Sequence, residues 1–535
     1  MPGMTRPNPL LLYALLVLLA ALGVFASTAN HGLGFSPDSF AYLRGADLVF
    51  SDPLTPSEDL SKFPPLYAAV LALLESNLTV IRWFNAAVLT LNLGLFAVAM
   101  QFTGVRWRVG LPVLAALALA PELVFRHSMV MSEPLFLLLI QITLLLLVHE
   151  RYGWALLPAA LLPMQRYAGV AFIAACVLYI WGHLGWRRGW RRALLFGGLA
   201  LLPVVGWLVR GSLVADNPRQ ILWHPVSLDH LRDAVLTLGG RYWFAPAAVV
   251  ALGLATINRA HLRALHLPRT VQAALLFIAC YVGFLLVSIS FYDFYTPLDS
   301  RILSPVLLLG WLVMAWFVDA QFALLKVGRR WWGLAFGVVL LGFGLFGAVR
   351  MAENNQEGVG LAQWIEDDYY PVLAALPENV IYYSNHTVVI DVMILNDPAL
   401  EHTRANSLPA KYDPITLVEN PDYESEYQQL MTRVEEGRAI IIWFDEVERD
   451  NVTSLAELEG LPVQDYNGLR IFGLVDAIAG ALWHNVRTVS AFISHQGQVY
   501  EQRQEKTHSH RGSPHRKAAS GALCGHAGEP GQASA

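Results

Sequence analysis

The sequence predicts an all-α polytopic membrane protein with about 11 transmembrane helices and a small extracytoplasmic α/β domain at the C-terminus. Of the 535 residues, 55% are apolar and only 15% are charged, whereas soluble domains usually carry about 25% charge. The mean hydropathy is +0.43, and the apolar residues fall into separate runs of membrane-spanning length. A disulfide-stapled secreted scaffold is excluded, because three cysteines cannot form its framework.

The apolar runs give the predicted spans. The first run, 10–29, has no convincing small-residue cleavage site and is roughly 20 residues long, so it predicts a retained helix rather than a signal peptide. The further runs lie at 80–103, 109–125, 132–149, 153–164, 167–182, 193–210, 242–257, 270–290, 302–320 and 331–349. The 153–164 run is short enough to be half-inserted.

The basic residues give the predicted orientation, because Lys and Arg collect in cytoplasmic loops. If the N-terminus is cytoplasmic, every basic cluster falls inside; the clusters lie at 106–108, 151, 187–192, 259–269 and 326–330. The acidic or mixed loops and the chain after residue 350 then lie outside. We therefore predict a multi-pass protein of the inner (cell) membrane with an extracytoplasmic C-terminal domain.

Three regions follow from the change of composition along the chain. Residues 1–350 form the membrane region, 351–476 the α/β domain, and 477–535 a largely disordered polar tail. In the α/β domain we expect strands at 380–384, 439–444 and 469–474 and helices at 359–376 and 423–436. The net charge of −5 gives no support for nucleic-acid binding.

Two acids stand at predicted helix starts on the outer side. Asp38 follows Ser36-Pro37, and Glu133 lies between Ser132 and Pro134. An ionisable residue within the bilayer costs about 2.5–3.5 kcal/mol, so such residues usually face a site or a partner. Each acid alone is also explained as a helix-terminal acid that the helix dipole favours.

Arginines occur in several outer turns, each beside an aromatic or acidic residue. The candidates are Arg126, Arg166 and Arg301. Their neighbours and the first-loop tyrosine are candidate substrate-binding residues: Tyr42, His127, Tyr167 and Asp299. Guanidinium groups are the usual bidentate holders of phosphate, although any one arginine could simply extend to the lipid headgroups.

In their order and common sidedness, these motifs resemble the GT-C glycosyltransferases. They are the acid-bearing first loop, the following Pro64-Pro65-Leu66-Tyr67 helix, the Ser132-Glu133-Pro134 start, the Gln165-Arg166-Tyr167 turn and the Arg301…Pro305 entry. The bacterial branch related to the protein mannosyltransferases and the lipid A aminoarabinose transferases is the most similar. The resemblance covers roughly residues 10–350, and the segments 381–385 and 439–444 resemble the outer domain often fused to such proteins.

This resemblance implies a hexosyl or pentosyl transferase that uses a polyprenyl-phosphate sugar donor. The acceptor would be a lipid, glycan or protein at the outer membrane face. Asp38 would be the general base for the acceptor hydroxyl, with Glu133 positioning the acceptor or a cation. Arg126, Arg166 and Arg301 would hold the donor phosphate and stabilise its leaving charge.

The resemblance leaves the cofactor and two other functions open. Many relatives carry an Asp-Glu pair where this chain has Asp38-Ser39, so no cofactor is assigned and a divalent cation remains an alternative. A polysaccharide polymerase or ligase should concentrate its basic residues in one large late loop. A secondary transporter should show an internal repeat, and the two halves of the chain show no such similarity.

Overall fold

The computed structural model describes most of the chain between residues 9 and 473. The described residues are 9–53, 60, 63–214, 223, 225–258, 266–292, 296–325, 328–364, 369–412, 419–445, 452–466 and 468–473. The predicted tail at 477–535 and parts of the basic clusters, 259–265 and 326–327, lie outside them.

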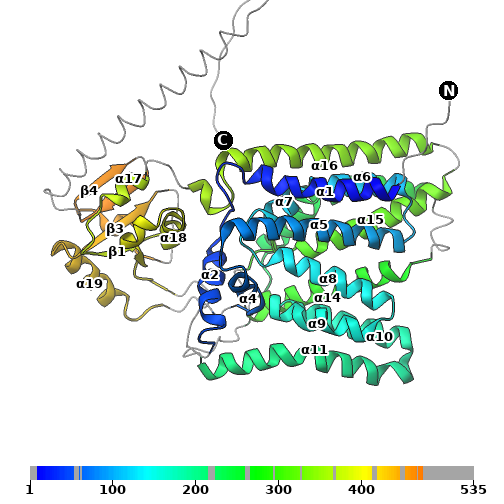
Figure 1. Ribbon diagram of the computed structural model, residues 1–535, viewed down its shortest axis with the longest axis horizontal. Helices are drawn as coiled ribbons and strands as arrows, with labels where there is room; N and C mark the ends of the chain where they lie inside the picture. Colours follow the sequence, from blue (N-terminus) through cyan, green and yellow to red (C-terminus); the bar gives the residue numbers. More distant parts are fainter. Residues whose placement is uncertain are drawn as a thin grey trace, which may run out of the picture.

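Apolar helices form a bundle in which most helices run roughly parallel or antiparallel to one another (Figure 1). They are α1 Pro9–Ser27, α5 Leu78–Phe102, α6 Trp107–Ala118, α7 Pro121–His127, α8 Glu133–Val148, α9 Tyr152–Gln165, α10 Gly169–Leu184, α11 Trp186–Val214, α13 Phe244–Ile257, α14 Arg269–Phe291, α15 Ser304–Leu324 and α16 Arg329–Glu357. Every predicted apolar run therefore coincides with a helix or a helix pair.

The predicted number of 11 spans is not confirmed. Among the described residues, six helices are long and apolar enough to cross a membrane, or eight if each of two bent pairs is one span. The other predicted spans are α8, α9 and α10, with 16, 14 and 16 residues. At 1.5 Å per residue they are about 21–24 Å long, shorter than a ~30 Å hydrocarbon core.

Each of the two bent pairs differs from its predicted span. The first pair breaks inside the predicted continuous run 109–125, and the second pair is longer than the predicted run 242–257. Helices α6 and α7 meet at 51°, with Pro121 at the start of α7. The second pair joins α12 Leu228–Val235 and the π-helix η1 Leu236–Arg241 to α13 at 71°. Proline at the first helical position favours a new helix start, which the apolar pattern of the 109–125 run does not reveal.

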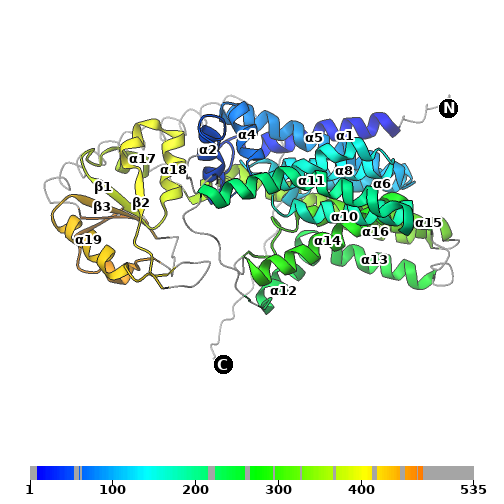
Figure 2. The same cartoon turned by 90° about the horizontal axis from the view of Figure 1, so that it is seen from below.

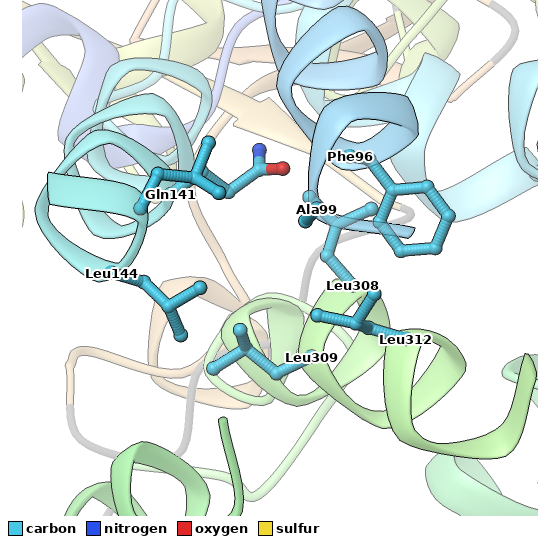
Figure 3. Close-up of a pocket in the computed structure, with 8 residues that line it drawn as sticks. Phe96, Ala99, Gln141, Leu144, Leu308, Leu309 and Leu312 are labelled. Carbon is cyan, nitrogen blue, oxygen red and sulfur yellow. The ribbon is translucent and has the colours of Figure 1, made fainter. Parts of the chain in front are cut away.

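The bundle interior is tightly packed. Large aromatic side chains such as Phe172, Phe277 and Trp311 are fully buried. Figure 3 shows side chains from α5, α8 and α15 around a small void, which is lined mainly by leucines and by Gln141. The void has room for about one water molecule, so it cannot hold a sugar or a lipid.

Two short helices cover one end of the bundle, where α5 and α8 begin (Figures 1 and 2). Helix α2 spans Pro37–Val49 and α4 spans Leu66–Leu73, as the Ser36-Pro37 and Pro64-Pro65 signals predict. The amide of Ser36 donates to the Ser39 hydroxyl at 2.8 Å, which fixes the first turn of α2.

The α/β domain lies beyond this same end of the bundle (Figure 1). Its elements are the 3₁₀ helix η3 Leu361–Trp364, α17 Tyr369–Ala374, β1 Ile381–Ser384, α18 Thr387–Asn396, the 3₁₀ helix η4 Pro398–Thr403, β2 Ala405–Ser407, α19 Tyr423–Glu435, β3 Ala439–Phe444, the 3₁₀ helix η5 Leu455–Leu458, β4 Val463–Tyr466 and β5 Leu469–Phe472. The sheet order is β2-β1-β3-β5-β4. Strands β1–β3 are parallel, and β4 and β5 form an antiparallel edge.

The domain contacts the helix that carries Asp38. Helix α18 packs on α2, and Arg44 Nη1 lies 3.4 Å from Asp391 Oδ2. Phe35 forms a parallel bridge with Gly360, and the amide of Leu361 donates to the Phe35 carbonyl at 2.9 Å. Gly360 is required here, because its φ is +65° and a Cβ would lie 2.3 Å from the Phe35 oxygen.

Candidate functional site

Four charged side chains meet at the end of the bundle beneath α2. Asp38 comes from the first turn of α2, Glu133 begins α8, Arg166 lies between α9 and α10, and Arg301 precedes α15. We call Asp38, Glu133, Arg166 and Arg301 the charged quartet. Four segments that are distant in sequence therefore place two acids and two arginines in contact.

Arg301 joins the two acids of the quartet. Its Nη1 lies 2.6 Å from Asp38 Oδ2, and its Nε lies 3.5 Å from Glu133 Oε1. Arg166 pairs with the same Glu133 oxygen. The Glu133 side chain is 1% exposed and that of Asp38 is 20% exposed. Glu133 is therefore the buried centre of the quartet, whereas Asp38 lies nearer the surface.

The carboxylates keep both quartet arginines charged. Burial by itself would lower the pKa of Arg301, but Asp38 and Glu133 raise it above the ordinary value. Burial likewise opposes the charge on Arg166, and Glu133 is the main group that raises its pKa. Fixed positive charges in a poorly hydrated site act more strongly on an anion than they would in water.

Arg126 lies in a neighbouring group that shares the Arg301 turn. Its Nη2 donates to Ser300 Oγ at 2.9 Å and lies 3.7 Å from Glu122 Oε2. Arg241 reaches the same two residues, at 3.4 Å to Ser300 and 3.9 Å to Glu122. We call Glu122, Arg126, Arg241 and Ser300 the Arg126 group. It holds two arginines but one acid, so it has an excess of positive charge.

Sequence reasoning missed Glu122 as a functional candidate. The available signal is its position four residues before Arg126, the spacing at which opposite charges pair on a helix. Two buried tyrosines that hold the turn between the groups were also missed. Tyr242 donates to the Ser300 carbonyl at 2.7 Å, and Tyr281 donates to the Ile302 carbonyl at 2.6 Å.

Two predicted substrate-binding residues have other partners. His127 is fully buried, with Nδ1 2.7 Å from the Leu123 carbonyl and Nε2 3.1 Å from Asn92 Nδ2. The Asp299 carboxylate accepts the backbone amides of Arg301 and Ile302 at 2.8 and 3.0 Å. In this structure both side chains contact the backbone or a core amide, and their contact with a substrate stays a prediction.

The two predicted tyrosines lie beside the quartet. Tyr42 is buried, and its hydroxyl lies 3.0 Å from Ser132 Oγ in a hydrogen bond. The same Ser132 oxygen accepts a hydrogen bond from Arg166 Nη1 at 3.1 Å. Tyr42 is thus linked to Arg166 of the quartet through the Ser132 hydroxyl. Tyr167 is half-buried in the same turn as Arg166, and its substrate contact stays a prediction.

The alternative of a divalent cation held by acids would be supported by a cluster of possible ligands among the described residues. No group of three or more His, Cys, Asp or Glu side chains that could hold a metal ion is found there. The two acids of the quartet face guanidinium groups instead.

The fold matches solved structures of a membrane enzyme. No protein-family model and no curated protein sequence matches the chain. Two crystal structures of ArnT from Cupriavidus metallidurans do, one bound to undecaprenyl phosphate and one in the apo state. Their TM-scores are 0.55 and 0.54 at 16% identity, and the match covers 86% of this chain and 98% and 97% of the ArnT chains.

ArnT is a lipid A aminoarabinose transferase with the GT-C fold. The match extends over nearly the whole ArnT chain, so the resemblance predicted from the outer-loop motifs is confirmed at the level of the fold. At 16% identity the likeness extends to the fold alone.

Proposed function

We propose that this chain is a membrane glycosyltransferase that moves a sugar from a polyprenyl-phosphate donor to a lipid, glycan or protein acceptor. The observation that carries the proposal is the charged quartet at one end of a bundle with the fold of ArnT, a protein crystallised with undecaprenyl phosphate. A donor of this kind enters sideways from the bilayer, so its site must lie at a membrane edge.

Asp38 is the proposed general base. Its carboxylate accepts the proton of the acceptor hydroxyl while that oxygen bonds to the sugar C1. The bond between C1 and the phosphate oxygen breaks, and its electron pair leaves with the polyprenyl phosphate. Asp38 suits this role better than Glu133 because it is the more exposed of the two acids.

The contact between Asp38 and Arg301 gives the donor a second role. Asp38 Oδ2 lies 2.6 Å from Arg301 Nη1, so one oxygen of this carboxylate is engaged with a guanidinium. A donor phosphate would compete with Asp38 for Arg301. Donor binding would thereby free the carboxylate to accept a proton, so that the base becomes active only with its substrate in place.

The arginines have two proposed tasks. Glu133 holds Arg166 and Arg301 at the reacting centre, where they stabilise the leaving phosphate. The excess positive charge of the Arg126 group supplies the initial attraction for the donor anion. The scheme draws its positive charge from guanidinium groups, so we expect turnover to persist in EDTA.

The same scheme includes the predicted orientation. Helix α2, which carries Asp38, lies at the end of the bundle next to the α/β domain (Figure 1) and contacts α18 of that domain. We propose that this end is extracytoplasmic, that the N-terminus is cytoplasmic and that the protein is located in the inner membrane. The α/β domain would then be placed to contact the acceptor.

The test is turnover of a polyprenyl-phosphate sugar by purified protein without any ion gradient. Released polyprenyl phosphate is measured with a panel of lipid and glycan acceptors. Asp38→Asn should lower turnover about 10³-fold, within the usual range for loss of a general base, without lowering the melting temperature. Asp47→Asn, an exposed acid on the same helix, is the matched control.

Each alternative result identifies a different function. Transport that requires a gradient, with no released polyprenyl phosphate, would favour a transporter. Products that contain many repeat units would favour a polymerase or ligase. Normal turnover in Asp38→Asn would remove the base assignment while leaving the enzyme class intact.

A further inference from the structure

The connection between α7 and α8 accepts hydrogen bonds from several other elements. We call residues 128–134 the linking segment. Five of its carbonyl oxygens accept donors from outside it, namely Ser128 from the Gly34 amide, Met129 from Asn85, Val130 from Ser39, Ser132 from Gln165, and Pro134 from Asn92. The distances lie between 2.7 and 3.0 Å.

Two of the four side-chain donors adjoin residues of the charged quartet. Ser39 directly follows Asp38, and Gln165 directly precedes Arg166. The linking segment itself contains Glu133. One stretch of backbone therefore carries one quartet residue and is hydrogen-bonded to the neighbours of two others.

Two buried asparagines hold the segment from the side of α5. Asn85 and Asn92 are seven residues apart, which is close to two helical turns, so they share one face of α5. Both are fully buried. Asn85 donates to the Met129 carbonyl at 2.8 Å and Asn92 to the Pro134 carbonyl at 3.0 Å. The pair holds the segment near its beginning and at its end.

Asn92 makes the most complete set of contacts. Its Nδ2 donates to both His127 Nε2 and the Pro134 carbonyl, and its Oδ1 accepts Gln141 Nε2 at 2.8 Å. Because Nδ2 can only donate, His127 Nε2 must accept, and its Nδ1 hydrogen then goes to the Leu123 carbonyl. One amide thus fixes the residue after Arg126 and the residue after Glu133.

We propose that Asn92 and Gln165 are positioning residues, which set the spacing of the charged quartet through the linking segment without touching a substrate. The inference rests on the proposed function for its kinetic consequence. A satisfied polar network in a low-dielectric interior is rigid, and loss of one donor leaves a buried acceptor unpaired. A displacement of about 1 Å in a catalytic group can cost about 100-fold in rate.

The test compares Asn92→Leu and Gln165→Leu with wild type. We expect each variant to lower kcat about 10- to 100-fold while the KM for the polyprenyl-phosphate sugar changes less than about threefold. A residue that only supports folding would lower the folded yield and leave kcat per folded molecule unchanged. The control is Thr143→Val, which removes a buried hydroxyl whose one hydrogen bond to the described residues is to the Leu139 carbonyl, within α8.

Hydrogen–deuterium exchange provides a readout that does not depend on the enzyme's activity. Asn92→Leu and Gln165→Leu should speed amide exchange in peptides that cover residues 128–134, and Thr143→Val should not. Unchanged exchange in both variants, or kcat within twofold of wild type in a folded variant, would overturn the inference. If wild type has no turnover, the proposed function fails, and the exchange result alone decides whether these residues hold the segment.

Discussion

The two ends of the helical bundle each contain a buried carboxylate paired with arginine, but the pairs are built differently. At the end where α1 begins, Arg106 Nε is 2.9 and 3.2 Å from the two Asp319 carboxylate oxygens, and Arg106 Nη2 donates to the Asp319 carbonyl at 2.8 Å. The backbone amide of Arg106 also donates to Asp319, at 3.3 Å. This pair is closed, because both carboxylate oxygens have donors within it.

The charged quartet at the other end is an open network. Arg301 is shared between two acids at unequal distances, 2.6 and 3.5 Å. Nearby, the buried Nε of Arg126 has no hydrogen-bond partner within the described residues. A closed pair joins two helices, whereas a network with spare donors can exchange partners with an incoming anion. The difference separates a structural ion pair from a candidate site.

Among the changes that compare the two ends, Glu133→Gln should have the largest effect on stability. Removing the buried carboxylate leaves Arg166 and Arg301 facing each other without an acid between them. Breaking a buried ion pair from one side costs about 3–5 kcal/mol, and we expect turnover to fall about 100-fold as the arginines move apart. Thermal unfolding and steady-state kinetics measure the two effects.

The matched control for this variant is Glu122→Gln in the Arg126 group. Glu122 lies 3.7 and 3.9 Å from its arginines and is more exposed than Glu133, so its loss should cost less stability than the loss of Glu133. Equal losses in both variants would mean that the two groups do not differ in kind.

The membrane helices could be predicted because length and apolarity are written directly in the sequence. Each apolar run became helical, yet α8, α9 and α10 are too short to count as spans, and α6, α7 and α13 count only within bent pairs. Hydropathy does not report where a run is interrupted; the break before Pro121 falls inside one apolar stretch. Helix α18 is not predicted, because its Val- and Ile-rich sequence is typical of a strand. It becomes helical where its apolar residues pack between the sheet core and the α2 region.

The sequence could predict which residues form the charged quartet, but not which way each neighbouring side chain points. Asp38, Glu133, Arg166 and Arg301 converge because each lies at a helix end on the same side of the bundle. His127 has the same sequence context, yet its ring is turned into the core by contacts to α5 and to its own helix. No sequence pattern states which way a side chain at a helix end points.

A medium effect is expected from the arginines of the Arg126 group. Arg126→Gln should raise the KM for the donor about tenfold, because a charge-assisted hydrogen bond contributes about 1.5–3 kcal/mol. Arg241→Gln should raise it only about threefold, because its side chain is 58% exposed and therefore screened. Steady-state kinetics with the purified protein measures both. A larger effect for Arg241 than for Arg126 would show that donor attraction occurs at the surface.

The closed pair of Arg106 and Asp319 should affect stability but not turnover when it is broken. Arg106→Leu leaves the buried Asp319 carboxylate without its main partner, and we expect a loss of about 2–3 kcal/mol of stability, below the full range for buried pairs. The loss is reduced because Arg106 is 39% exposed. The kcat per folded molecule should stay within twofold of wild type. A large fall in kcat with an unchanged melting temperature would contradict the division between the two ends.

The smallest effect concerns a second closed group, in the α/β domain. Glu457 lies 2.7 Å from Lys411 Nζ and accepts the Ser454 amide at 2.7 Å. Burial alone would raise the pKa of Glu457, but these donors lower it from 4.5 to about 2. Between these values the unfolded chain binds a proton that the folded domain does not. The contribution of Glu457 to the free energy of unfolding is therefore fully present above pH 4.5 and declines as the pH falls towards 2. Thermal melts across this range should show a shallow decline that Glu457→Gln reduces. Because the side chain is about one-third exposed, the change should be small; an undiminished decline in Glu457→Gln would assign the acid sensitivity to other carboxylates.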